Sequence, residues 1–385
     1  MSEFRTIREL CSVVVDCPHS TPKWTANGKI VIRNNNIKHG RIDFSSPSYT
    51  DDEHFAQRIK RAKPQPGDII ITREAPIGDV GMIPENTECC LGQRMVLLRA
   101  NQSVCDNFYL LYSLQSLYVQ HQISWSEGTG TTVSNLRIPH LEQIQIPYLP
   151  LEQQAKISSV LRALEEKIEN NRRLNDNLQQ QAMSLYAEMF LNSSDSNVTS
   201  GTLSDIAVIT MGQSPSGSSY NEDGVGEVFY QGRAEFGFRF PKRRLFTTEP
   251  KRIAEAGDVL LSVRAPVGDL NIAYERCCIG RGLGAIHSKT GHSSFVLYTM
   301  FALRSQLDVF NGEGTVFGSI NRDALNAIPI DIPPVTEIDQ FEVVAHPIDE
   351  LIRANYEENC RLEAIRDSLL PKLMSGEIDI SAVQL

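Results

Sequence analysis

The chain of 385 residues is 41% hydrophobic and 22% charged, and its formal net charge is −10. This composition is typical of a globular protein of two or three domains, and the absence of an apolar run of about 18 residues excludes a membrane-spanning helix from our expectations. The N-terminus lacks the apolar core of a signal peptide, and a chain of this length does not need its eight cysteines for disulfides. We therefore expect a reduced, cytoplasmic setting and no membrane partner.

The negative charge is concentrated in two parts of the chain. Residues 1–147 carry 15 basic and 15 acidic side chains, and residues 201–331 carry 13 and 14. Residues 148–200 carry 5 and 7, and residues 332–385 carry 4 and 11. An acidic chain is generally unfavourable for nucleic-acid binding, but the two nearly neutral segments can still present a basic face.

Motifs of the first half of the chain return in the second half. Residues 66–79 read PGDIIITREAPIGD, and residues 256–269 read AGDVLLSVRAPVGD, 190 positions later. The segment CCLG at 89–92 returns as CCIG at 277–280, and GTGT at 128–131 returns as GEGT at 312–315. Three shared segments in the same order indicate a tandem duplication of a unit of about 185 residues.

Each repeat is predicted to mix strands and helices. Asp68–Thr72 and Asp258–Ser262 are short β-branched or apolar runs bounded by glycine and proline, which predicts strands. The Ala-Pro-x-Gly-Asp segment after each run predicts a turn. Apolar residues with helical spacing predict helices over Asn107–Gln120 and Ser294–Leu307.

Two segments, 148–195 and 332–385, have the heptad spacing of long helices, and the second pattern repeats the first 184 positions later. If the helices pair antiparallel, Asn171 and Asn175 would meet Asn359 and Asn355. A seam of about 32 residues spans roughly 50 Å, a length typical of a spacer, although two ordinary amphipathic helices are the alternative. The seam residues on which the prediction centres are Ile168, Asn171, Asn175, Leu178, Ile352, Asn355, Asn359 and Leu362.

Proline and glycine interrupt the second helical pattern. Pro347 is expected to mark a helix start or a kink near Ile348, because proline lacks the N–H that a helix interior requires. Pro371 and Gly376 are expected to kink or end the helix.

The ordered set of these motifs resembles the specificity subunit of type I restriction–modification enzymes over essentially the whole chain. Further similarities are the stretches DCPHSTP at 16–22, PLEQQ at 150–154, MGQSP at 211–215 and LPKLMSGEI at 370–378. The resemblance implies an α+β fold with two pseudo-repeated mixed α/β target-recognition domains, separated by two long antiparallel coiled-coil helices. We place the domains at 1–147 and 196–331 and the helices at 148–195 and 332–385. Pro347 and the charged Arg366 depart from the pattern and leave the straightness and the tail of the second helix in doubt.

The resemblance also implies an adaptor with no catalytic residues of its own. Each domain would read one half of a bipartite site in double-stranded DNA, and the helices would set the gap. Two DNA methyltransferase subunits and the restriction (motor–nuclease) subunits are the implied protein partners. S-adenosylmethionine would be held by the methyltransferase and ATP with Mg²⁺ by the motor subunit, so no cofactor or metal is expected in this chain. The alternative is a stand-alone DNA-binding or spacer protein without a methyltransferase partner.

Motifs that would make the chain itself a methyltransferase are missing from the sequence. An amino-methyltransferase needs Asn/Asp-Pro-Pro-Tyr/Phe, and the stretch IPPV at 332–335 lacks both the polar and the aromatic end. No Gly-x-Gly-x-x-Gly follows a predicted strand, and no phosphate loop ends in Gly-Lys-Ser/Thr. These observations favour an adaptor over an enzyme.

Side chains suited to DNA gather in both domains, because arginine favours guanine, and asparagine and glutamine favour adenine. The candidates in the first domain are His19, Ser20, Thr21, Lys23, Arg33, Asn34, Asn35, Arg73 and Arg94. Those in the second are Gln213, Ser214, Tyr220, Gln231, Arg233, Lys242, Arg243, Arg244, Arg264 and Arg281. For each basic residue a solvated surface charge is the alternative. Arg94 and Arg281 rank above the others because the repeat places them together.

Three further features have two interpretations each. The loops 128–132 and 312–315 either approach phosphate through backbone N–H groups or form tight turns. The cysteine pairs 89–90 and 277–278 are predicted to be buried apolar side chains rather than zinc ligands, because adjacent cysteines lack the spacing of a zinc site. Phe236, Phe238 and Phe240 alternate, which predicts one face of a strand rather than a base-stacking platform.

Overall fold

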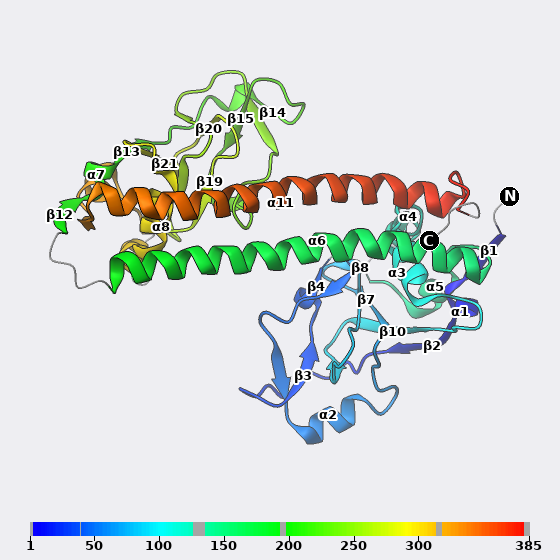
Figure 1. Ribbon diagram of the computed structural model, residues 1–385. Helices are drawn as coiled ribbons and strands as arrows, with labels where there is room; N and C mark the ends of the chain where they lie inside the picture. The colour runs from blue at the N-terminus through cyan, green and yellow to red at the C-terminus, as the bar shows by residue number, and fades with distance from the viewer. Residues whose placement is uncertain (1–2, 39, 126–134, 193–197, 313–317, 381–385) are drawn as a thin grey trace. The chain divides into compact units, whose positions relative to one another are not determined.

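The computed structural model describes residues 3–38, 40–125, 135–192, 198–312 and 318–380. The chain divides into two compact units (Figure 1): unit 1 is Met1–Asn170 with Glu358–Leu385, and unit 2 is Asn171–Glu357. Two long helices, α6 (Leu151–Tyr186) and α11 (Val335–Ser375), each contribute one part to unit 1 and the other to unit 2. The four segment limits expected from the sequence stay a prediction, because the units divide the helices rather than follow chain order.

The central sheet of unit 1 lies between two hydrophobic cores. Its strand order is β2-β10-β7-β8, and all its pairings are antiparallel. Ile69 and Ile71 of β7 face a core shared with α3 and both long helices, whereas Ile70 faces a core shared with β3 and β9. This alternation is the period of two that a strand buried on both faces requires.

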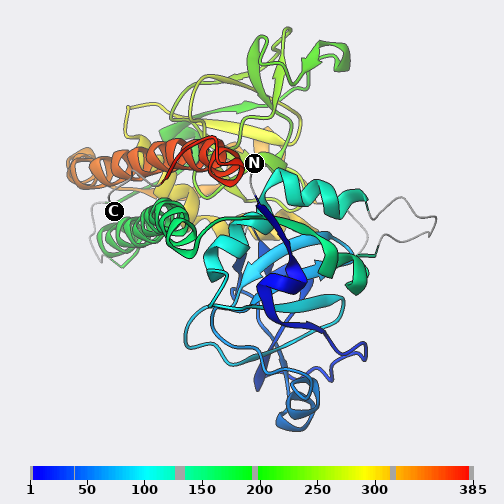
Figure 2. The same cartoon turned by 90° about the vertical axis from the view of Figure 1, so that its right-hand side faces the viewer.

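Unit 1 also contains a three-stranded sheet, β6-β3-β9, and the two-stranded pairs β1-β11 and β4-β5. Its strands are β1 (Glu3–Thr6), β2 (Cys11–Asp16), β3 (Lys29–Ile32), β4 (Ile37–Lys38), β5 (Arg41–Ile42), β6 (Ser48–Thr50), β7 (Ile69–Arg73), β8 (Ile77–Met82), β9 (Cys89–Leu91), β10 (Met95–Ala100) and β11 (Gln145–Tyr148). Its helices are α1 (Ile7–Leu10), α2 (Asp52–Arg58), α3 (Asn107–Gln115), α4 (Leu117–Trp125) and α5 (Ile138–Gln143), with a 3₁₀ turn η1 (Asn34–Asn36). Two views place α2 at the end of unit 1 that is remote from α6 (Figures 1 and 2).

Unit 2 repeats this architecture. Its central sheet has the order β13-β21-β18-β19, and a second sheet has the order β14-β16-β15-β20-β17. Val259 and Leu261 of β18 face the core shared with α8 and both long helices, and Leu260 faces the opposite core. The same alternation in equivalent strands confirms the duplication.

The strands of unit 2 are β12 (Thr199–Thr202), β13 (Ala207–Met211), β14 (Tyr220–Asn221), β15 (Glu227–Tyr230), β16 (Leu245–Thr247), β17 (Ile253–Ala254), β18 (Val259–Ser262), β19 (Leu270–Ile272), β20 (Cys277–Ile279), β21 (Leu283–Ser288) and β22 (Pro329–Ile332). Its helices are α7 (Leu203–Ile206), α8 (Ser293–Ala302), α9 (Arg304–Asp308) and α10 (Arg322–Asn326), with short helical turns η3 (Ala187–Leu191), η4 (Gly217–Ser219), η5 (Arg233–Glu235) and η6 (Val309–Asn311). The fold class expected from the sequence, mixed α and β in two repeats with long antiparallel helices, is confirmed.

The repeated Gly-Asp motif is a structural turn. Asp68 and Asp258 are buried, and each accepts a 2.8 Å hydrogen bond from the backbone N–H three residues earlier. Gly67 and Gly257 have φ values of +83° and +90°, in the left-handed region that favours glycine. The motif therefore recurs because the same turn begins β7 and β18.

The repeated Ala-Pro-x-Gly-Asp motif is closed by a hydroxyl group. Thr72 Oγ1 accepts from the N–H of Asp79 at 2.9 Å, and Ser262 Oγ accepts from the N–H of Asp269 at 3.0 Å. Both Ala-Pro peptide bonds are cis. The turn predicted from the sequence is present in both units.

The seam of the long helices is buried as the heptad spacing predicted. In unit 2, Asn355 Nδ2 donates to Asn175 Oδ1 at 2.8 Å, and Tyr186 packs on Phe341 with ring centroids 5.6 Å apart. In unit 1, Asn359 Nδ2 donates to the carbonyl oxygen of Ile168 at 3.3 Å. The higher-numbered residues of α6 meet the lower-numbered residues of α11, so the helices run antiparallel. The buried seam residues are Ile157, Leu161, Ile168, Asn171, Asn175, Ala182, Phe341, Ala345, Ile352, Asn355, Asn359 and Leu373, while Leu178 and Leu362 are half-buried.

Of the two expectations for Pro347, a helix start near Ile348 is wrong, whereas a kink there stays a prediction. Helix α11 begins at Val335 and continues through Pro347 and Pro371 to Ser375. Pro347 is exposed, and so is Val343, four residues earlier, whose carbonyl loses its helical donor. Water can therefore satisfy this carbonyl, and the helix tolerates the proline. Gly376 follows the last helical residue, as expected for a helix end.

The predicted helices after the central strands are each divided in two. Ser116 has ψ 146° and ends α3, and its carbonyl oxygen accepts from the N–H of Gln120 in α4. In unit 2, Leu303 separates α8 from α9 with ψ 1°. Apolar spacing alone could not locate these breaks, because the apolar face continues across them. Among the described helices, none is long and apolar enough to cross a membrane.

Replacing one asparagine of the buried amide pair should destabilise unit 2. In Asn175→Ala the amide of Asn355 loses its partner in a buried position, and we expect a loss of about 1–3 kcal/mol. The double variant Asn175→Leu/Asn355→Leu should recover much of this loss. Thermal unfolding measures both, with the exposed Asn177→Ala as the matched control. If the double variant lost as much unfolding free energy as two independent replacements would, the pairing of the two amides would be contradicted.

Candidate nucleic-acid interface

Unit 1 has an open hollow of about 460 Å³ that collects several of the predicted DNA-contacting residues. Arg33, Asn34, Asn35 and Arg94 line it together, so the structure brings these four together. The remaining lining residues are Pro22, Trp24, Ala75, Gly92 and Gln93. A polar, partly aromatic hollow of this kind can accept the edges of bases.

Short polar contacts fix the shape of the hollow. The N–H of Arg33 donates to Asn36 Oδ1 at 2.9 Å, which closes the turn η1 directly after β3. Asn34 Nδ2 donates to the carbonyl oxygen of Glu74 at 2.7 Å. The guanidinium of Arg33 lies 5.3 Å from the ring centroid of Trp24, within the range of a cation–π contact. The side chain of Asn35 is exposed at the rim.

Arg94 adopts a backbone conformation that L residues rarely take, with φ +65°. Its Nε lies 3.3 Å from Glu74 Oε2, but its side chain remains 58% exposed. Arg94 is therefore available to a ligand. A carboxylate that also contacts a neighbouring loop restrains its position.

Arg73 was predicted to contact DNA, but the structure buries its side chain among partners within the protein. It is the last residue of β7 and is 9% exposed. Its guanidinium donates to both carboxylate oxygens of Asp16, to the carbonyl oxygen of Leu136 and to Asn135 Oδ1. With all these donors used inside the protein, Arg73 supports the interface and does not face a ligand.

The segment from His19 to Lys23 is a loop, as predicted, and hydrogen bonds from Arg58 fix the backbone at its start. Arg58, the last residue of α2, donates to the carbonyl oxygens of Pro18, Ser20, Leu91 and Gly92. Gln93 Nε2 donates to the carbonyl oxygen of His19. The loop that begins with His19 is therefore tied to one wall of the hollow.

Two side chains of this loop form ion pairs, and two others are exposed. His19 pairs with Asp16 at 2.9 Å, and Lys23 pairs with Asp51 at 3.2 Å. Hydrogen bonds from the backbone and side chain of His54 lower the pKa of Asp51 to about 2, so this carboxylate is ionised at neutral pH. Ser20 and Thr21 are exposed.

In unit 2 three loops meet and bring four predicted residues together. The N–H of Gln213 donates to the carbonyl oxygen of Ile279, and the N–H of Arg281 donates to Ser214 Oγ at 3.3 Å. The N–H of Gly282 donates to the carbonyl oxygen of Gln231 at 3.2 Å. Gln213, Ser214, Gln231 and Arg281 therefore form one cluster, which we call the unit 2 loop cluster.

A glycine permits this close approach of loops. A Cβ on Gly280 would lie 2.9 Å from both Cα and the carbonyl oxygen of Gln231, which is closer than Cβ atoms pack. The Gly of the repeated Cys-Cys-x-Gly segment is thus required by backbone packing and not by a metal site.

Arg264 adjoins the unit 2 loop cluster. The preceding residue, Val263, donates its N–H to the carbonyl oxygen of Gly282 at 3.0 Å. The side chains of Arg264 and Arg281 are exposed, and neither guanidinium pairs with a residue in the described part of the chain. These two cations are the ones in unit 2 that remain open to a ligand beside the cluster.

The backbone hydrogen bonds give the register of the repeat and correct its assignment by one residue. The N–H of Arg73 donates to the carbonyl oxygen of Arg94, and the equivalent bond runs from Val263 to Gly282. Arg281 therefore corresponds to Gln93, not to Arg94. In the same way, Gly92 bonds to Ile32 as Gly280 bonds to Tyr230, so Arg33 corresponds to Gln231. Sequence reasoning missed Gln93, which a stricter count from the Cys-Cys-x-Gly segment would have found.

Trp24 is the second residue that the sequence analysis missed. Its ring is 46% exposed and lines the hollow beside Arg33. Its signal was present in the sequence, because Trp24 directly follows the predicted polar loop. No repeat motif marked it.

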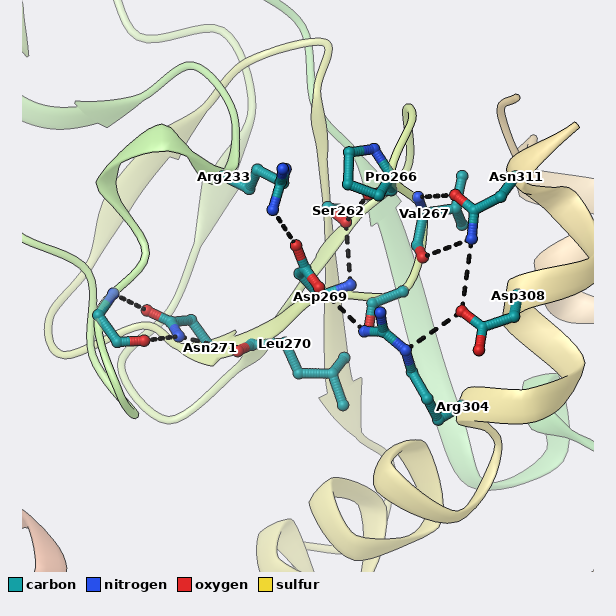
Figure 3. A network of polar contacts seen from close by, with 12 residues as sticks. Arg233, Ser262, Pro266, Val267, Asp269, Leu270, Asn271, Arg304, Asp308 and Asn311 are labelled. Atoms are coloured by element: carbon teal, nitrogen blue, oxygen red, sulfur yellow. Dashed lines mark hydrogen bonds and ion pairs between the residues drawn. The ribbon is translucent and has the colours of Figure 1, made fainter. Parts of the chain in front are cut away.

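Arg233 is held in a polar network rather than free (Figure 3). Its guanidinium and that of Arg304 both pair with Asp269, and Arg304 also pairs with Asp308. Asn311 Oδ1 accepts from the N–H of Val267 at 2.6 Å. The network ties η5 to the repeated Ala-Pro turn and to α9, so Arg233 stabilises the loop beside Gln231.

The predicted basic cluster at 242–244 is largely paired. Arg243 pairs with Glu275, and Arg244 pairs with the buried Glu235 at 2.7 Å. Lys242 is exposed. Tyr220 is half-buried, with its hydroxyl donating to the carbonyl oxygen of Pro215 and its ring packed at a tilt against Phe229.

The prediction that Phe236, Phe238 and Phe240 form one face of a strand is wrong. The segment follows η5 and contains no strand. Phe240 is buried against Tyr274 and Tyr356, whereas Phe238 is 49% exposed. Alternating phenylalanines do not distinguish a strand from an irregular loop that buries only some of them.

The cysteine pairs are buried, as predicted. Cys89-Cys90 lies in β9, which pairs in parallel with β3, and Cys277-Cys278 lies in β20, which pairs in parallel with β15. Burial raises the pKa of Cys89 to about 12 and that of Cys90 to about 11, so both remain thiols. Within the described ranges no group of three metal-ligating side chains gathers. Loop 128–132 and most of 312–315 lie outside the described residues.

Comparisons with known proteins give a consistent result. A family model described as the type I restriction modification DNA specificity domain matches residues 3–180 and 195–359. Two proteins of Methanocaldococcus jannaschii are similar in sequence. A putative type I restriction enzyme MjaX specificity subunit is 28% identical over 98% of this chain and 94% of its own length, and the MjaIX specificity subunit is 24% identical over 82% and 78%.

A solved structure has a similar fold. The S subunit of the type I restriction–modification system of M. genitalium aligns with a TM-score of 0.58 and 18% identity, over 97% of this chain and 96% of that one. At this identity the likeness concerns the fold alone.

Replacing Arg73 and replacing Arg94 by alanine should have different effects on stability and on DNA binding. Arg73→Ala leaves Asp16 without its buried partner, and we expect a loss of about 3–5 kcal/mol in unfolding free energy. Arg94→Ala removes an exposed side chain and should change stability by less than about 0.5 kcal/mol while weakening binding to duplex DNA. Thermal unfolding and fluorescence anisotropy with labelled DNA measure the two effects. Equal destabilisation by both variants would contradict the division into supporting and contacting residues.

Proposed function

The chain belongs to the family of type I restriction–modification DNA specificity proteins, and on this premise we propose that each unit reads one half of a bipartite site in double-stranded DNA. As a specificity subunit it recognises DNA and carries no catalytic function itself. The observation that carries the proposal is the equivalence of two clusters. The hollow of unit 1 and the loop cluster of unit 2 are built at matching positions of a duplicated fold, with different side chains at those positions.

The differences between the two clusters support different half-sites. Position for position, Arg33 corresponds to Gln231, and Gln93 corresponds to Arg281. Arginine is suited to a bidentate contact with guanine, and glutamine to one with adenine. At each of these two positions one unit has arginine and the other has glutamine. Such a difference is expected of a protein that recognises two unlike sequences.

Base contacts require neighbouring phosphate contacts to position the protein. In unit 1, Arg94, Ser20 and Thr21 are exposed beside the hollow and are suited to this role. In unit 2, Lys242 and Arg264 are exposed. Because residues 1–147 and 201–331 are each nearly neutral, these local cations and not the net charge would supply the attraction to DNA.

We propose two DNA methyltransferase subunits and the restriction subunits as the partners of the complex, with the long helices as the spacer and docking surface. S-adenosylmethionine would then be bound by the methyltransferase, and ATP with Mg²⁺ by the restriction subunit, with no cofactor in this chain. A DNA substrate of this kind implies a cytoplasmic location. The stand-alone alternative is not favoured, because the relatives are specificity subunits of restriction enzymes.

Exchanging residues 1–147 for the equivalent domain of a relative should change one half-site and leave the other unchanged. The readout is genome-wide mapping of methylated positions in cells that carry the hybrid and its methyltransferase. A simultaneous change of both half-sites would refute independent reading by the two units.

Single residues of the unit 2 loop cluster should affect only the second half-site. Arg281→Ala should reduce discrimination at one base pair by about 1–3 kcal/mol, or roughly 5- to 150-fold, because it removes a bidentate reader. The matched control is Lys251→Ala, an exposed cation outside the cluster. Methylation mapping in cells checks this, and a uniform loss at both half-sites would count against a reading role for Arg281.

A further inference from the structure

In unit 2 a buried polar group joins the globular part to a long helix. The hydroxyl of Tyr298 in α8 donates to Asp349 Oδ1 of α11 at 2.8 Å. Arg239 Nη1 lies 3.2 Å from the same oxygen, and Arg239 Nη2 donates to the Tyr298 hydroxyl at 3.2 Å. Arg239 is 3% exposed, so this contact is shielded from solvent.

Unit 1 contains a related group, in which the tyrosine and the helix carboxylate stand at equivalent positions but the arginine contacts other atoms of the helix. The hydroxyl of Tyr112 in α3 donates to Glu165 Oε2 of α6 at 3.0 Å. Arg41 Nη2 donates to the carbonyl oxygen of Glu165 at 3.0 Å, and Arg41 Nη1 to Glu169 Oε2 at 2.7 Å. Glu165 and Asp349 are separated by the 184 positions that relate the two helical seams.

The two arginines come from the same loop of the fold. The N–H of Met82 donates to the carbonyl oxygen of Gly40, and the equivalent bond runs from Ile272 to Arg239. Arg41 and Arg239 are thus one residue apart in structural register, and each turns its guanidinium toward the helix. The tyrosine–carboxylate hydrogen bond is therefore duplicated, and in each unit an arginine of the same loop also contacts the helix. We name each group of arginine, tyrosine and helix carboxylate a latch.

Each latch lies eight residues after a proposed reader. Arg33 precedes Arg41, and Gln231 precedes Arg239, by the same distance in sequence. Backbone hydrogen bonds run from Asp43 to Asn36 in unit 1 and from Lys242 to Glu235 in unit 2. In each unit such a bond links a residue just after the latch arginine to the turn that follows the proposed reader.

Both tyrosines keep their protons at neutral pH, because burial raises the pKa of each hydroxyl. A partly buried hydrogen bond to a carboxylate is directional, and it favours one angle between the helix and the globular part. Apolar packing alone would allow the two to slide, because it is not directional.

We propose that the two latches are positioning elements, in which Arg41, Tyr112 and Glu165, and likewise Arg239, Tyr298 and Asp349, fix each reading surface relative to its helix and so restrict the length of the DNA gap that the protein accepts. The proposal rests on the proposed reading of a bipartite site. It assigns these residues no contact with DNA.

The test uses the full chain with its methyltransferase in cells and measures methylation at sites with altered gaps. In Tyr298→Phe and Asp349→Asn the two half-site sequences should stay the same, while methylation at sites with a gap one base pair longer or shorter should rise about tenfold relative to the preferred gap. Tyr112→Phe and Glu165→Gln should do the same from unit 1. Glu350→Gln, at an exposed position of α11, is the matched control and should leave the gap preference unchanged.

A conservative variant separates positioning from folding. Asp349→Glu introduces the residue that unit 1 has at this position and should retain the gap preference of the parent chain. Reduced methylation at every site with an unchanged gap preference, or no change at all, would overturn the latch proposal. If the parent chain directs no methylation to a two-part site, the proposed function fails first, which distinguishes the two failures.

Discussion

The directional pairing of amides in an otherwise apolar helix seam is the constraint on which the rest of the structure depends. Leucine and isoleucine contacts alone would let two antiparallel helices shift by a heptad, because one apolar layer resembles the next. The bond from Asn355 to Asn175 forms in the observed register, and a shift of one helix along the other would break it. Because both units use parts of both helices, the same register determines which residues of α6 and α11 enter each core.

The duplicated units have similar backbones but different residues in their loops. The Gly-Asp turn, the hydroxyl-closed Ala-Pro turn and the alternation across the central strands all recur, since each is needed to place a strand between two cores. The loops that contain Arg33 and Gln231 do not position a strand in this way. They have arginine in one unit and glutamine in the other at the same position of the fold.

Much of the architecture could be predicted from the sequence, because periodicity reports which face of an element is buried. The heptad seam, the strands after each Gly-Asp and the buried cysteine pairs depend on that local signal. The path of α11 through Pro347 could not be predicted, because tolerance of a proline depends on whether the freed carbonyl faces water. The breaks at Ser116 and Leu303 were also missed, since the apolar face continues past both.

The candidate site was predicted less well, for a related reason. Composition identifies an arginine but not its partners, and Arg73, Arg233, Arg243 and Arg244 all lie near carboxylates supplied by distant segments. Arg33, Asn34, Asn35 and Arg94 were found because they lie in loops beside repeated strands. Gln93 and Trp24 were missed although the sequence holds a signal for each, because only the structure shows that both line the same hollow.

The arrangement of unit 1 has a consequence for how the chain is made. Its larger core includes Leu373, Met374 and Ile380, which leave the ribosome after all of unit 2. During synthesis Leu161 of α6, which lies in that core, therefore lacks its contacts with these residues until more than 200 further residues have been added. By then every residue of unit 2 has been translated. The first part of the protein to be translated is thus the last to be finished.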